Sequence, residues 1–520
     1  MTETSPSEST RADSSGPEQR VEFHPATVPL EEILHLSRPL FVDSDEAWRQ
    51  LRYIQDYVRD LDCKTVVVER HYIDRDYMED HSVFYSKSLH GYPNYCQRLH
   101  FFRSNEKTLR TELRRLQSLD SAAPNQPQRA ADALRRAHSE FAENAYLGFA
   151  VIKPLPGCPV GRTVLRPVSR NASGYKRRFD CLCDYHAHFL GVSLHIKGLA
   201  FQQQDIGVSA CATTALWTAL QRASQVERGN AATPAQITMR ASQFALPFGR
   251  SMPSEGLSLD QMCVAVQSFG YSPMLFKLES PRVSRALLFG SINSGIAPVL
   301  ILSNSHLRHA VTAAGMAVLT DKQLPTDSAL AQNEAHALTG LYIHDDRYGP
   351  YLKADIVETH SSLSLRMELA GGGREEWSLT HILLPVYPKV RLSFAQLDTA
   401  GLRLTSDVQG FRSLGDPSRS GLRWSSRIIR SHRYVEQLMH EPRTRDVART
   451  VAESVRLPRY LAVISLEAND LDRSDVLLDT TSTERNLTCL AVIPRSVSRA
   501  NTIAIATWLA EKYRCPLVRS

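Results

Sequence analysis

The chain has 520 residues, of which 42% are apolar and 22% are charged, and its formal net charge is +6. This length is too great for one hydrophobic core, so we expect two or three domains. The mild positive charge does not indicate a nucleic-acid partner, because such proteins concentrate their basic residues on one face. No segment has the roughly 18 to 20 apolar residues of a membrane span, and the N-terminus lacks the apolar core of a secretory signal. Nine cysteines are too few for a disulfide framework, so we expect a cytoplasmic protein without a membrane span.

The N-terminal part of the chain divides into a tail and an α/β region. Residues 1–20 are mostly Ser, Thr, Pro and charged residues with little to bury, which predicts disorder. Residues 21–198 mix helical spacing of apolar residues with short β-branched runs, which predicts an N-terminal α/β region. Helices are expected at 30–41, 46–61, 105–119 and 128–145, and strands at 65–70, 147–168 and 180–201.

Two groups of possible metal ligands lie in this region. The first is Asp74, Asp76 and Asp80, in a segment at 71–102 that is rich in Asp, His and Tyr. Carboxylates of this kind can bind a cation. We prefer to interpret the segment as a solvated loop with an aromatic face that packs on the following domain.

The second group forms a C-x-C-x-x-H-x-H pattern, whose four side chains are competent zinc ligands. Its spacing is unlike that of a usual zinc finger. If the segment is a strand, the cysteine pair and the histidine pair face opposite ways, because successive side chains alternate. We therefore predict a buried, half-polar strand without a metal. The four residues are Cys181, Cys183, His186 and His188.

The most informative segment is QQQDIGVSACATTALWTALQRA at 202–223. From Cys211 onward its apolar residues recur at helical spacing, and Ser209 stands where an N-cap belongs, so Cys211 is expected in the first turn of a helix. The positive end of the helix dipole and the free N–H groups there favour a thiolate, the attacking form of cysteine. The alternative is an inert cysteine of the core.

Two further features favour a nucleophilic role for Cys211. Three consecutive glutamines end at Gln204, and a side-chain amide at this place can donate to an oxyanion. His309 opens an apolar strand, where it could serve as the base. His306, three residues earlier, is its rival, but it lies in a polar turn and is interpreted as a surface residue.

A strand ending near residue 345 supplies a third group, because it ends in two carboxylates, Asp345 and Asp346. Either carboxylate could hold an imidazole in the right tautomer and orientation. Strand alternation implies that only one of them points to the same face as the histidine. The chain thus presents Gln, Cys, His and Asp in this order.

This ordered set resembles the C39-like cysteine peptidases, which have a papain-like fold, as one domain of a larger bacterial-type protein. In that family a Gln precedes a helix-starting Cys, a His opens a strand in an HxVxxxG context, and an Asp lies in a D-x-x-x-G turn. The matching positions are His309, Val311 and Gly315 in the strand, and Asp345 and Gly349 in the turn. The resemblance implies a peptidase domain at 199–362 of α+β class, with helices followed by an antiparallel sheet.

The segment between Cys211 and His309 also fits the resemblance. A second helix is predicted at 255–271, where Ser258 and Gln261 form a capping box. A third helix then leads into a strand at 297–303.

Two departures from the family pattern concern the oxyanion donor and the carboxylate. The family places Gln six residues before Cys, and Asp205 occupies that position here. Gln204, or Gln203 as second choice, would therefore serve from a loop of different length. The D-x-x-x-G register favours Asp345 over Asp346 as the orienting group.

Residues 363–520 are expected to form a C-terminal α/β region. Within it, GGGREEW at 371–377 is interpreted as a flexible glycine turn, because it lacks the Lys-Ser/Thr ending of a phosphate loop. The stretch 419–433 is the most basic local segment, and it could contact nucleic acid or an acidic partner, although solvated basic faces are common. Strands are expected near 381–394, 402–408, 459–469 and 488–495, and helices at 443–455 and 502–513.

The sequence therefore predicts a cysteine peptidase that hydrolyses a peptide or isopeptide bond of a protein or peptide substrate. Cys211 attacks, His309 transfers the proton, and Asp345 orients the imidazole. Gln204 and the backbone N–H of Cys211 hold the oxyanion, and no cofactor or metal is expected. The resemblance implies cleavage after small residues such as paired glycines. Two alternatives stay open: an inactive papain-like binding or scaffold module, and an amide or acyl transferase that uses the same triad.

Overall fold

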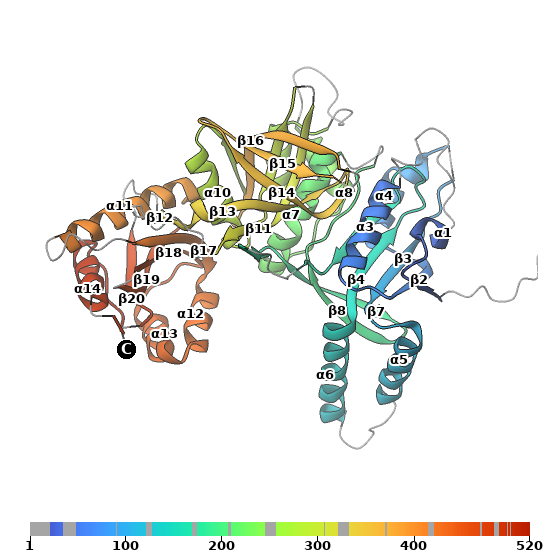
Figure 1. The fold of residues 1–520 in the computed structure, drawn as a ribbon, viewed down its shortest axis with the longest axis horizontal. Helices are drawn as coiled ribbons and strands as arrows, with labels where there is room; N and C mark the ends of the chain where they lie inside the picture. Colours follow the sequence, from blue (N-terminus) through green and yellow to red (C-terminus); the bar gives the residue numbers. More distant parts are fainter. Residues whose placement is uncertain are drawn as a thin grey trace, which may run out of the picture.

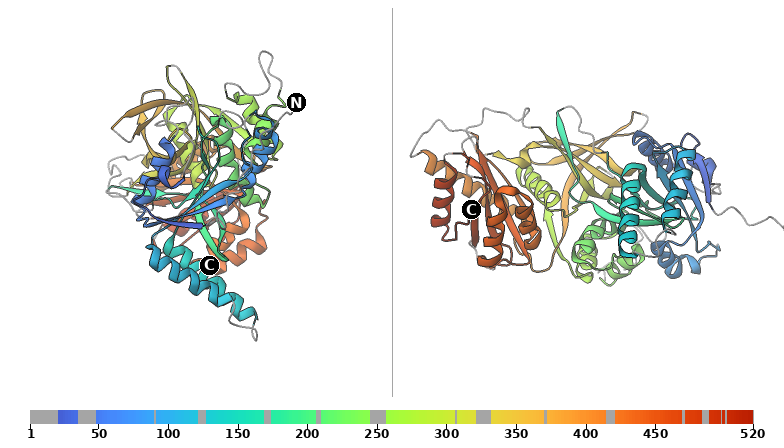
Figure 2. Two further views of the ribbon diagram at one scale, coloured as in Figure 1. Left: turned by 90° about the vertical axis from the view of Figure 1, so that its right-hand side faces the viewer. Right: turned by 90° about the horizontal axis from the view of Figure 1, so that it is seen from below.

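The computed structural model arranges the chain as three sheets in a row. Figure 1 shows the N-terminal sheet at one end, a central sheet in the middle and the C-terminal sheet at the other end, and the right-hand view in Figure 2 gives the same order. None of the described helices is both long enough and apolar enough to cross a membrane. The structure describes residues 21–34, 48–89, 91–120, 127–168, 174–205, 210–244, 256–305, 307–320, 332–369, 372–413, 421–468, 471–482, 488–496, 498–499 and 501–519.

The N-terminal sheet is antiparallel with the order β1-β2-β3-β4-β5, and a two-stranded ribbon, β7-β8, follows it in the chain. These elements confirm the predicted helices at 46–61, 105–119 and 128–145 and the strand at 65–70. The tail at 1–20 lies outside the described residues. The strands are β1 (Val21–Pro25), β2 (Thr65–Tyr72), β3 (Cys96–Phe102), β4 (Tyr146–Ile152), β5 (Val160–Leu165), β7 (Cys183–Phe189) and β8 (Val192–Gly198). The helices are α1 (Leu30–Leu34), α3 (Arg49–Asp60), α4 (Arg75–Val83), α5 (Glu106–Asp120) and α6 (Pro127–Ala145).

The central sheet closes on itself as a six-stranded antiparallel barrel, because its last strand, β16, pairs back with its first, β10. Two further strands join it from elsewhere in the chain: β9 (Ser272–Lys277) pairs with β16, and β6 (Tyr175–Arg178) pairs with β11. The barrel strands are β10 (Val299–Ser303), β11 (Arg308–Leu319), β13 (Leu338–Asp345), β14 (Gly349–Glu358), β15 (Leu363–Glu368) and β16 (Arg374–Val386).

This barrel overturns the expected α+β, papain-like core of helices followed by an open sheet. The strand that closes it, β16, lies beyond residue 362, and β9 interrupts the run of helices before the sheet. Periodicity predicts which segments are strands, but hydrogen-bond closure between β10 and β16 joins residues about 80 positions apart and leaves no local signal.

Helices α7 (Cys211–Glu227), α9 (Leu259–Ser268) and α10 (Pro281–Asn293) pack on strands of the central sheet, and α8 (Pro234–Ala241) packs on α7 and α9. The predicted second helix is confirmed as α9, including the capping box of Ser258 and Gln261. Helix α7 packs against β11, where Thr312 Oγ1 donates a hydrogen bond of 2.7 Å to the carbonyl of Ala215. Its buried residues surround the helix, including Leu216, Trp217 and Leu220, so α7 is a central element of the core.

The C-terminal sheet has the order β12-β17-β18-β19-β20 and helices on both faces. Alternation along β18 explains the two faces, because Leu461 and Val463 pack with α12 and α13 whereas Ala462 and Ile464 join the main core. The strands are β12 (Gln332–Asn333), β17 (Arg423–Arg430), β18 (Tyr460–Ala468), β19 (Leu471–Asp479) and β20 (Cys489–Pro494). The helices are α11 (Phe394–Ser413), α12 (Ser431–His440), α13 (Arg445–Ser454) and α14 (Thr502–Lys512).

The strand predicted at 402–408 is wrong, since these residues belong to α11. The buried Leu397, Leu404 and Val408 recur at helical spacing, and the close approach of Gly401 to Trp424 seats the helix on β17. The helical spacing of these apolar residues is visible only when the sequence is read from residue 394 rather than from 402.

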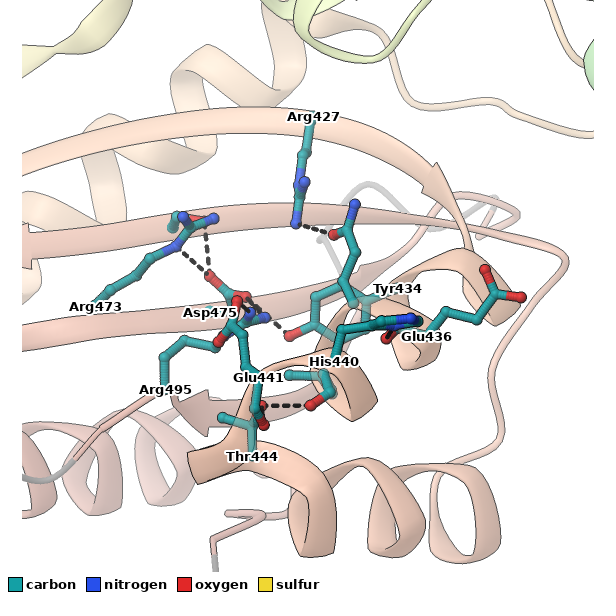
Figure 3. A network of polar contacts seen from close by, with 12 residues as sticks. Arg427, Tyr434, Glu436, His440, Glu441, Thr444, Arg473, Asp475 and Arg495 are labelled. Atoms are coloured by element: carbon teal, nitrogen blue, oxygen red, sulfur yellow. Dashed lines mark hydrogen bonds and ion pairs between the residues drawn. The ribbon is translucent and has the colours of Figure 1, made fainter. Parts of the chain in front are cut away.

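A buried aspartate, Asp475 of β19, ties the C-terminal sheet to α12 (Figure 3). It accepts hydrogen bonds from the Ser465 hydroxyl at 2.7 Å and the Tyr434 hydroxyl at 2.9 Å. The guanidinium groups of Arg495 and Arg473 lie 3.2 and 3.4 Å from its two oxygens. Burial opposes the charge of Asp475, but the arginines outweigh burial and hold its pKa below the usual range.

Candidate active site

Cys211 is the first residue of α7, and its side chain is half-buried. The N-cap position belongs to Ala210, which has extended backbone and makes no side-chain cap. Ser209, expected as the N-cap, lies outside the described residues. The first-turn N–H groups of a helix have no partner within the helix, so the thiol lies where backbone donors and the positive end of the dipole converge.

His309 lies near the start of β11, is 6% exposed, and joins the thiol to a carboxylate. Its Nε2 lies 2.9 Å from Oδ1 of Asp345. The side chain of Cys211 is also within hydrogen-bond reach of the ring. Because Asp345 takes Nε2, Nδ1 is the ring nitrogen left for the thiol. The structure thus brings together three of the four predicted site residues.

Both neighbouring carboxylates approach the same ring nitrogen. Asp345 is the last residue of β13 and the closer one, whereas Asp346 Oδ1 lies 3.5 Å from Nε2 of His309. The expectation that strand alternation sends only one of them to the ring is wrong. Asp346 already belongs to the turn, and the register of β13 shifts between Ile343 and Asp345, so alternation ends before this pair.

Electrostatics at these three groups favour a protonated imidazole. Burial disfavours the charge of Asp345, but His309 and Arg347 outweigh burial and hold its pKa well below the usual range. Burial also lowers the pKa of His309, yet Asp345, Cys211 and Asp346 together raise it well above 6.5. Burial raises the pKa of Asp346 to about 7, against the attraction of His309.

Side chains from the turn after β13 and from β16 support the triad, and the sequence analysis did not identify these side chains. Arg347 Nη2 lies 3.0 Å from Asp345 Oδ2 and 3.1 Å from Glu375 Oε2. Glu375 also accepts a hydrogen bond of 2.9 Å from the indole of Trp377, whose ring centroid lies 5.9 Å from that of His309. Glu375 and Trp377 belong to the segment interpreted as a glycine turn. Their separation by two residues, which places them on one face of a strand, was the available signal.

Helix α3 of the N-terminal region holds the turn that carries the carboxylates. Gln50 Nε2 donates hydrogen bonds of 3.0 Å to the carbonyls of Asp346 and Arg347. The Tyr53 ring approaches so closely that a Cβ on Gly349 would lie 2.1 Å from its Cδ1. The glycine of the D-x-x-x-G pattern is therefore required by packing against α3, and the site depends on the N-terminal region.

The expected oxyanion donor, Gln204, is exposed, and the described residues show no contact between it and Cys211. Gln203, the second choice, is buried and uses its Oε1 to accept from the backbone N–H of Val160 at 3.2 Å. Gln202 is buried too, and its Nε2 has no hydrogen-bond partner among the described residues. Of the three glutamines, Gln202 thus keeps an unused amide donor.

The C-x-C-x-x-H-x-H segment forms the predicted strand, β7. Cys181 and Cys183 are buried, whereas His186 and His188 are exposed on the other side, as alternation predicted. Burial raises the pKa of Cys183 to about 11, as expected for a thiol inside the core. His306, the rival of His309, lies outside the described residues.

Among the described residues, the only cluster with metal-binding geometry consists of His309, Asp345 and Asp346, whose ligand atoms lie within 4.8 Å of one another. These groups could hold a divalent cation. Arg347, which is paired with Asp345, would then compete with the cation for the same carboxylate. The arginine favours the triad over a metal centre.

The interpretation of residues 71–102 as a solvated loop is wrong, because the segment contains α4 and β3 and its three candidate aspartates are buried on or beside α4. Asp74 caps α4 and pairs with Arg162 at 2.6 Å, and Asp76 accepts from the Trp217 indole at 3.2 Å. Asp80 accepts from the backbone N–H of Ala235 at 3.1 Å. Asp74 thus fastens α4 to β5 of its own sheet, and Asp76 and Asp80 fasten it to α7 and α8.

No protein-family model matches the chain, and no curated protein matches its sequence. The likeness to C39-like peptidases therefore stays at the level of spaced motifs. The evidence for the function of the site is its own geometry, in which a buried imidazole lies between a half-buried thiol and a buried carboxylate.

Proposed function

We propose that this chain is a cysteine hydrolase that cleaves a peptide or isopeptide bond with Cys211 as its nucleophile. The observation that carries the proposal is the position of His309, whose Nε2 lies 2.9 Å from Oδ1 of Asp345 and whose ring is within hydrogen-bond reach of the Cys211 side chain. A nucleophile, a base and a group that orients the base are the three parts that covalent acyl transfer needs. The half-buried thiol is within reach of a substrate, unlike the fully buried carboxylates.

The geometry suggests the following steps. The thiolate of Cys211 attacks the carbonyl carbon, and the protonated His309 gives its proton to the departing amine, which leaves a thioester on the sulfur. His309 then takes a proton from water, the resulting hydroxide attacks the thioester, and the acid departs as the C–S bond breaks, which restores the thiolate beside the protonated imidazole. Asp345 keeps the imidazole in one tautomer and stabilises its charged form.

The oxyanion would be held by the first-turn N–H groups of α7, which lie beside the sulfur. A side-chain amide would have to come from the glutamine run that ends at Gln204. Because the side chain of Gln204 is exposed and Nε2 of Gln202 is buried and unused, Gln202 is the better placed to supply a donor.

Residue-resolved alkylation tests the proposal without a known substrate. The full-length protein is treated with iodoacetamide between pH 5 and 9, and the rate at each cysteine is read by mass spectrometry. Cys263 of α9 is the matched reference, because it is also half-buried and burial raises the pKa of its thiol. At pH 6 we expect Cys211 to react on the order of 100-fold faster than Cys263, since an ordinary thiol is almost wholly protonated there.

Hydrolysis is tested separately with a peptide library whose products are sequenced by mass spectrometry. Cys211→Ala should abolish cleavage and Cys263→Ala should leave it unchanged. Equal alkylation rates at the two cysteines, or cleavage that survives Cys211→Ala, would remove the basis of the proposal.

A further inference from the structure

A cavity far from the thiol lies where the barrel region meets the C-terminal sheet. It has a volume of about 250 Å³ and is bordered by the end of α7, the end of α10 and the junction of β17 with α12. Helix α7 has 17 residues, so at about 1.5 Å per residue its two ends are roughly 25 Å apart. Cys211 lies at one end and this cavity at the other, which makes them separate places.

The floor of the cavity is rigid and aromatic. Tyr387 and Tyr460 stack with their ring centroids 4.4 Å apart and their planes inclined by 5°. Glu227, at the last turn of α7, accepts from the Tyr460 hydroxyl and pairs with Arg430 at 3.0 Å. Barrel, helix and C-terminal sheet are therefore fastened together below the cavity.

The wall of the cavity carries more positive than negative charge. The described lining includes four arginines and His432 but one carboxylate, Asp184, which pairs with His195 at 3.2 Å. Two of the arginines have carboxylate partners, namely Arg430 with Glu227 and Arg433 with Glu436. The other two, Arg222 and Arg228, have none within ion-pair distance among the described residues, and the buried Nε of Arg222 has no hydrogen-bond partner there.

The N-terminal turn of helix α12 adds to this charge. Helix α12 begins at Ser431, and its first turn contains no acidic residue and no side-chain cap. Its residues His432 and Arg433 line the cavity, so the positive end of the α12 dipole lies at the wall. The carbonyl end of α7 also borders the cavity and offsets part of this charge, but Arg222 and Arg228 belong to the same end of that helix.

We propose that this cavity binds a small phosphate-bearing molecule, of the class of phosphomonoester dianions. Guanidinium groups from the end of α7 and the N-terminal turn of α12 line the same cavity, and donors from two separate elements suit the tetrahedral oxygens of phosphate better than a planar carboxylate. The volume leaves room for a phosphate with a small organic group. The basic stretch at 419–433 then has a definite role, since its last residues form one wall. The proposal does not depend on the chemistry of Cys211.

Calorimetric titration of the full-length protein tests the site. Inorganic phosphate and adenosine monophosphate are titrated at constant ionic strength in sodium chloride, with acetate as the planar carboxylate control. We expect saturable binding of at least one phosphate compound and none of acetate. Tighter binding of the nucleotide identifies an organic phosphate as the ligand, and equal affinities identify free phosphate. The Cys211→Ala protein should bind equally well.

Three variants locate the binding. Arg222→Gln and Arg228→Asn should each weaken binding by about tenfold or more, because each removes a charged donor, and asparagine suits the left-handed backbone at position 228. Arg240→Gln, on the exposed surface of α8, removes the same charge elsewhere and should leave affinity unchanged. If Arg222→Gln does not fold, as judged by circular dichroism, Arg433→Gln takes its place.

Three results would overturn the proposal. The first is the absence of saturable heat with either phosphate compound. The second is equal binding of acetate, which would mean that the arginines only balance the carbonyl end of α7. The third is an Arg240→Gln variant that loses as much affinity as the cavity variants, which would mean that binding depends on the net charge of the protein and not on the cavity.

Discussion

Two aspartates of this protein, Asp345 in the barrel and Asp475 in the C-terminal sheet, are alike in burial and charge but differ in their hydrogen-bond partners. Both are 0% exposed, both lie beside arginines, and in both the partners hold the pKa below the usual range. Asp475 accepts hydrogen bonds from a tyrosine and a serine and pairs with arginines (Figure 3). Asp345 shares a hydrogen bond with His309, whose ring is within reach of the half-buried Cys211.

The comparison teaches that a buried, well-paired carboxylate does not by itself mark a functional site. What matters is the group at the end of its hydrogen-bond chain. A series of hydrogen bonds that ends in the interior contributes to stability. A series that ends at a reactive group within reach of solvent can contribute to catalysis. The two aspartates should therefore respond differently to the same substitution.

The largest effect is expected from Asp475→Asn. It leaves the buried Arg495 facing a neutral group, and losing one partner of a buried charge pair costs about 3–5 kcal/mol. Native-state hydrogen exchange of the C-terminal sheet should report this loss in its opening free energy, while alkylation of Cys211 stays unchanged.

Asp355→Asn is the matched control, since this aspartate is half-exposed and pairs with Lys353 at 2.9 Å. A surface pair of this kind contributes at most about 1 kcal/mol. Equal losses for the two variants would mean that the Asp475 network does not stabilise the sheet as described.

The next largest effect is expected from His309→Gln. Without the charged ring the thiolate loses its partner, so the rate of Cys211 alkylation at pH 6 should fall on the order of 100-fold. His381→Gln, which alters another half-buried histidine of the barrel, should leave the rate within a factor of two or so of wild type. A His309→Gln protein that is alkylated as fast as wild type would break the link between ring and thiol.

Asp345→Asn should change the titration of His309. Burial alone lowers the pKa of the ring, and Asp345 is the largest of the groups that raise it, so the pKa of His309 should fall in the variant. Because folding raises this pKa above 6.5, its contribution to stability is full below pH 6.5 and is lost as pH rises through the folded value. Nitrogen-15 NMR of the imidazole measures the shift, and an unchanged titration would contradict the pairing.

The smallest effect is expected from Gln50→Ala. The variant leaves the carbonyls of Asp346 and Arg347 without their donor from α3, which should cost about 1 kcal/mol of local stability in the turn. Alkylation of Cys211 should slow by severalfold as Asp345 loses its fixed position. Gln117→Ala is the control, since Gln117 also bonds to a carbonyl, that of Leu190, but on the exposed surface. If both variants behave alike, α3 does not position the turn.

The local part of the site could be predicted from the sequence. The helical spacing after Cys211 predicted α7, the apolar run after His309 predicted β11, and the Ser258–Gln261 capping box predicted α9. These features depend on neighbours within one or two turns of helix or along one strand. Periodicity and capping record such neighbours directly.

What the sequence by itself determined, then, is the identity of most helices and strands and the order of the residues with chemistry. Only the tertiary structure decided that the sheet closes through β16, that Asp346 joins Asp345 at one ring nitrogen, and that α3 and Glu375 hold them there. The same holds for the cavity between α7 and α12. The physical reason is that these contacts join groups from distant parts of the chain, whose meeting depends on packing and burial of the whole rather than on any local preference.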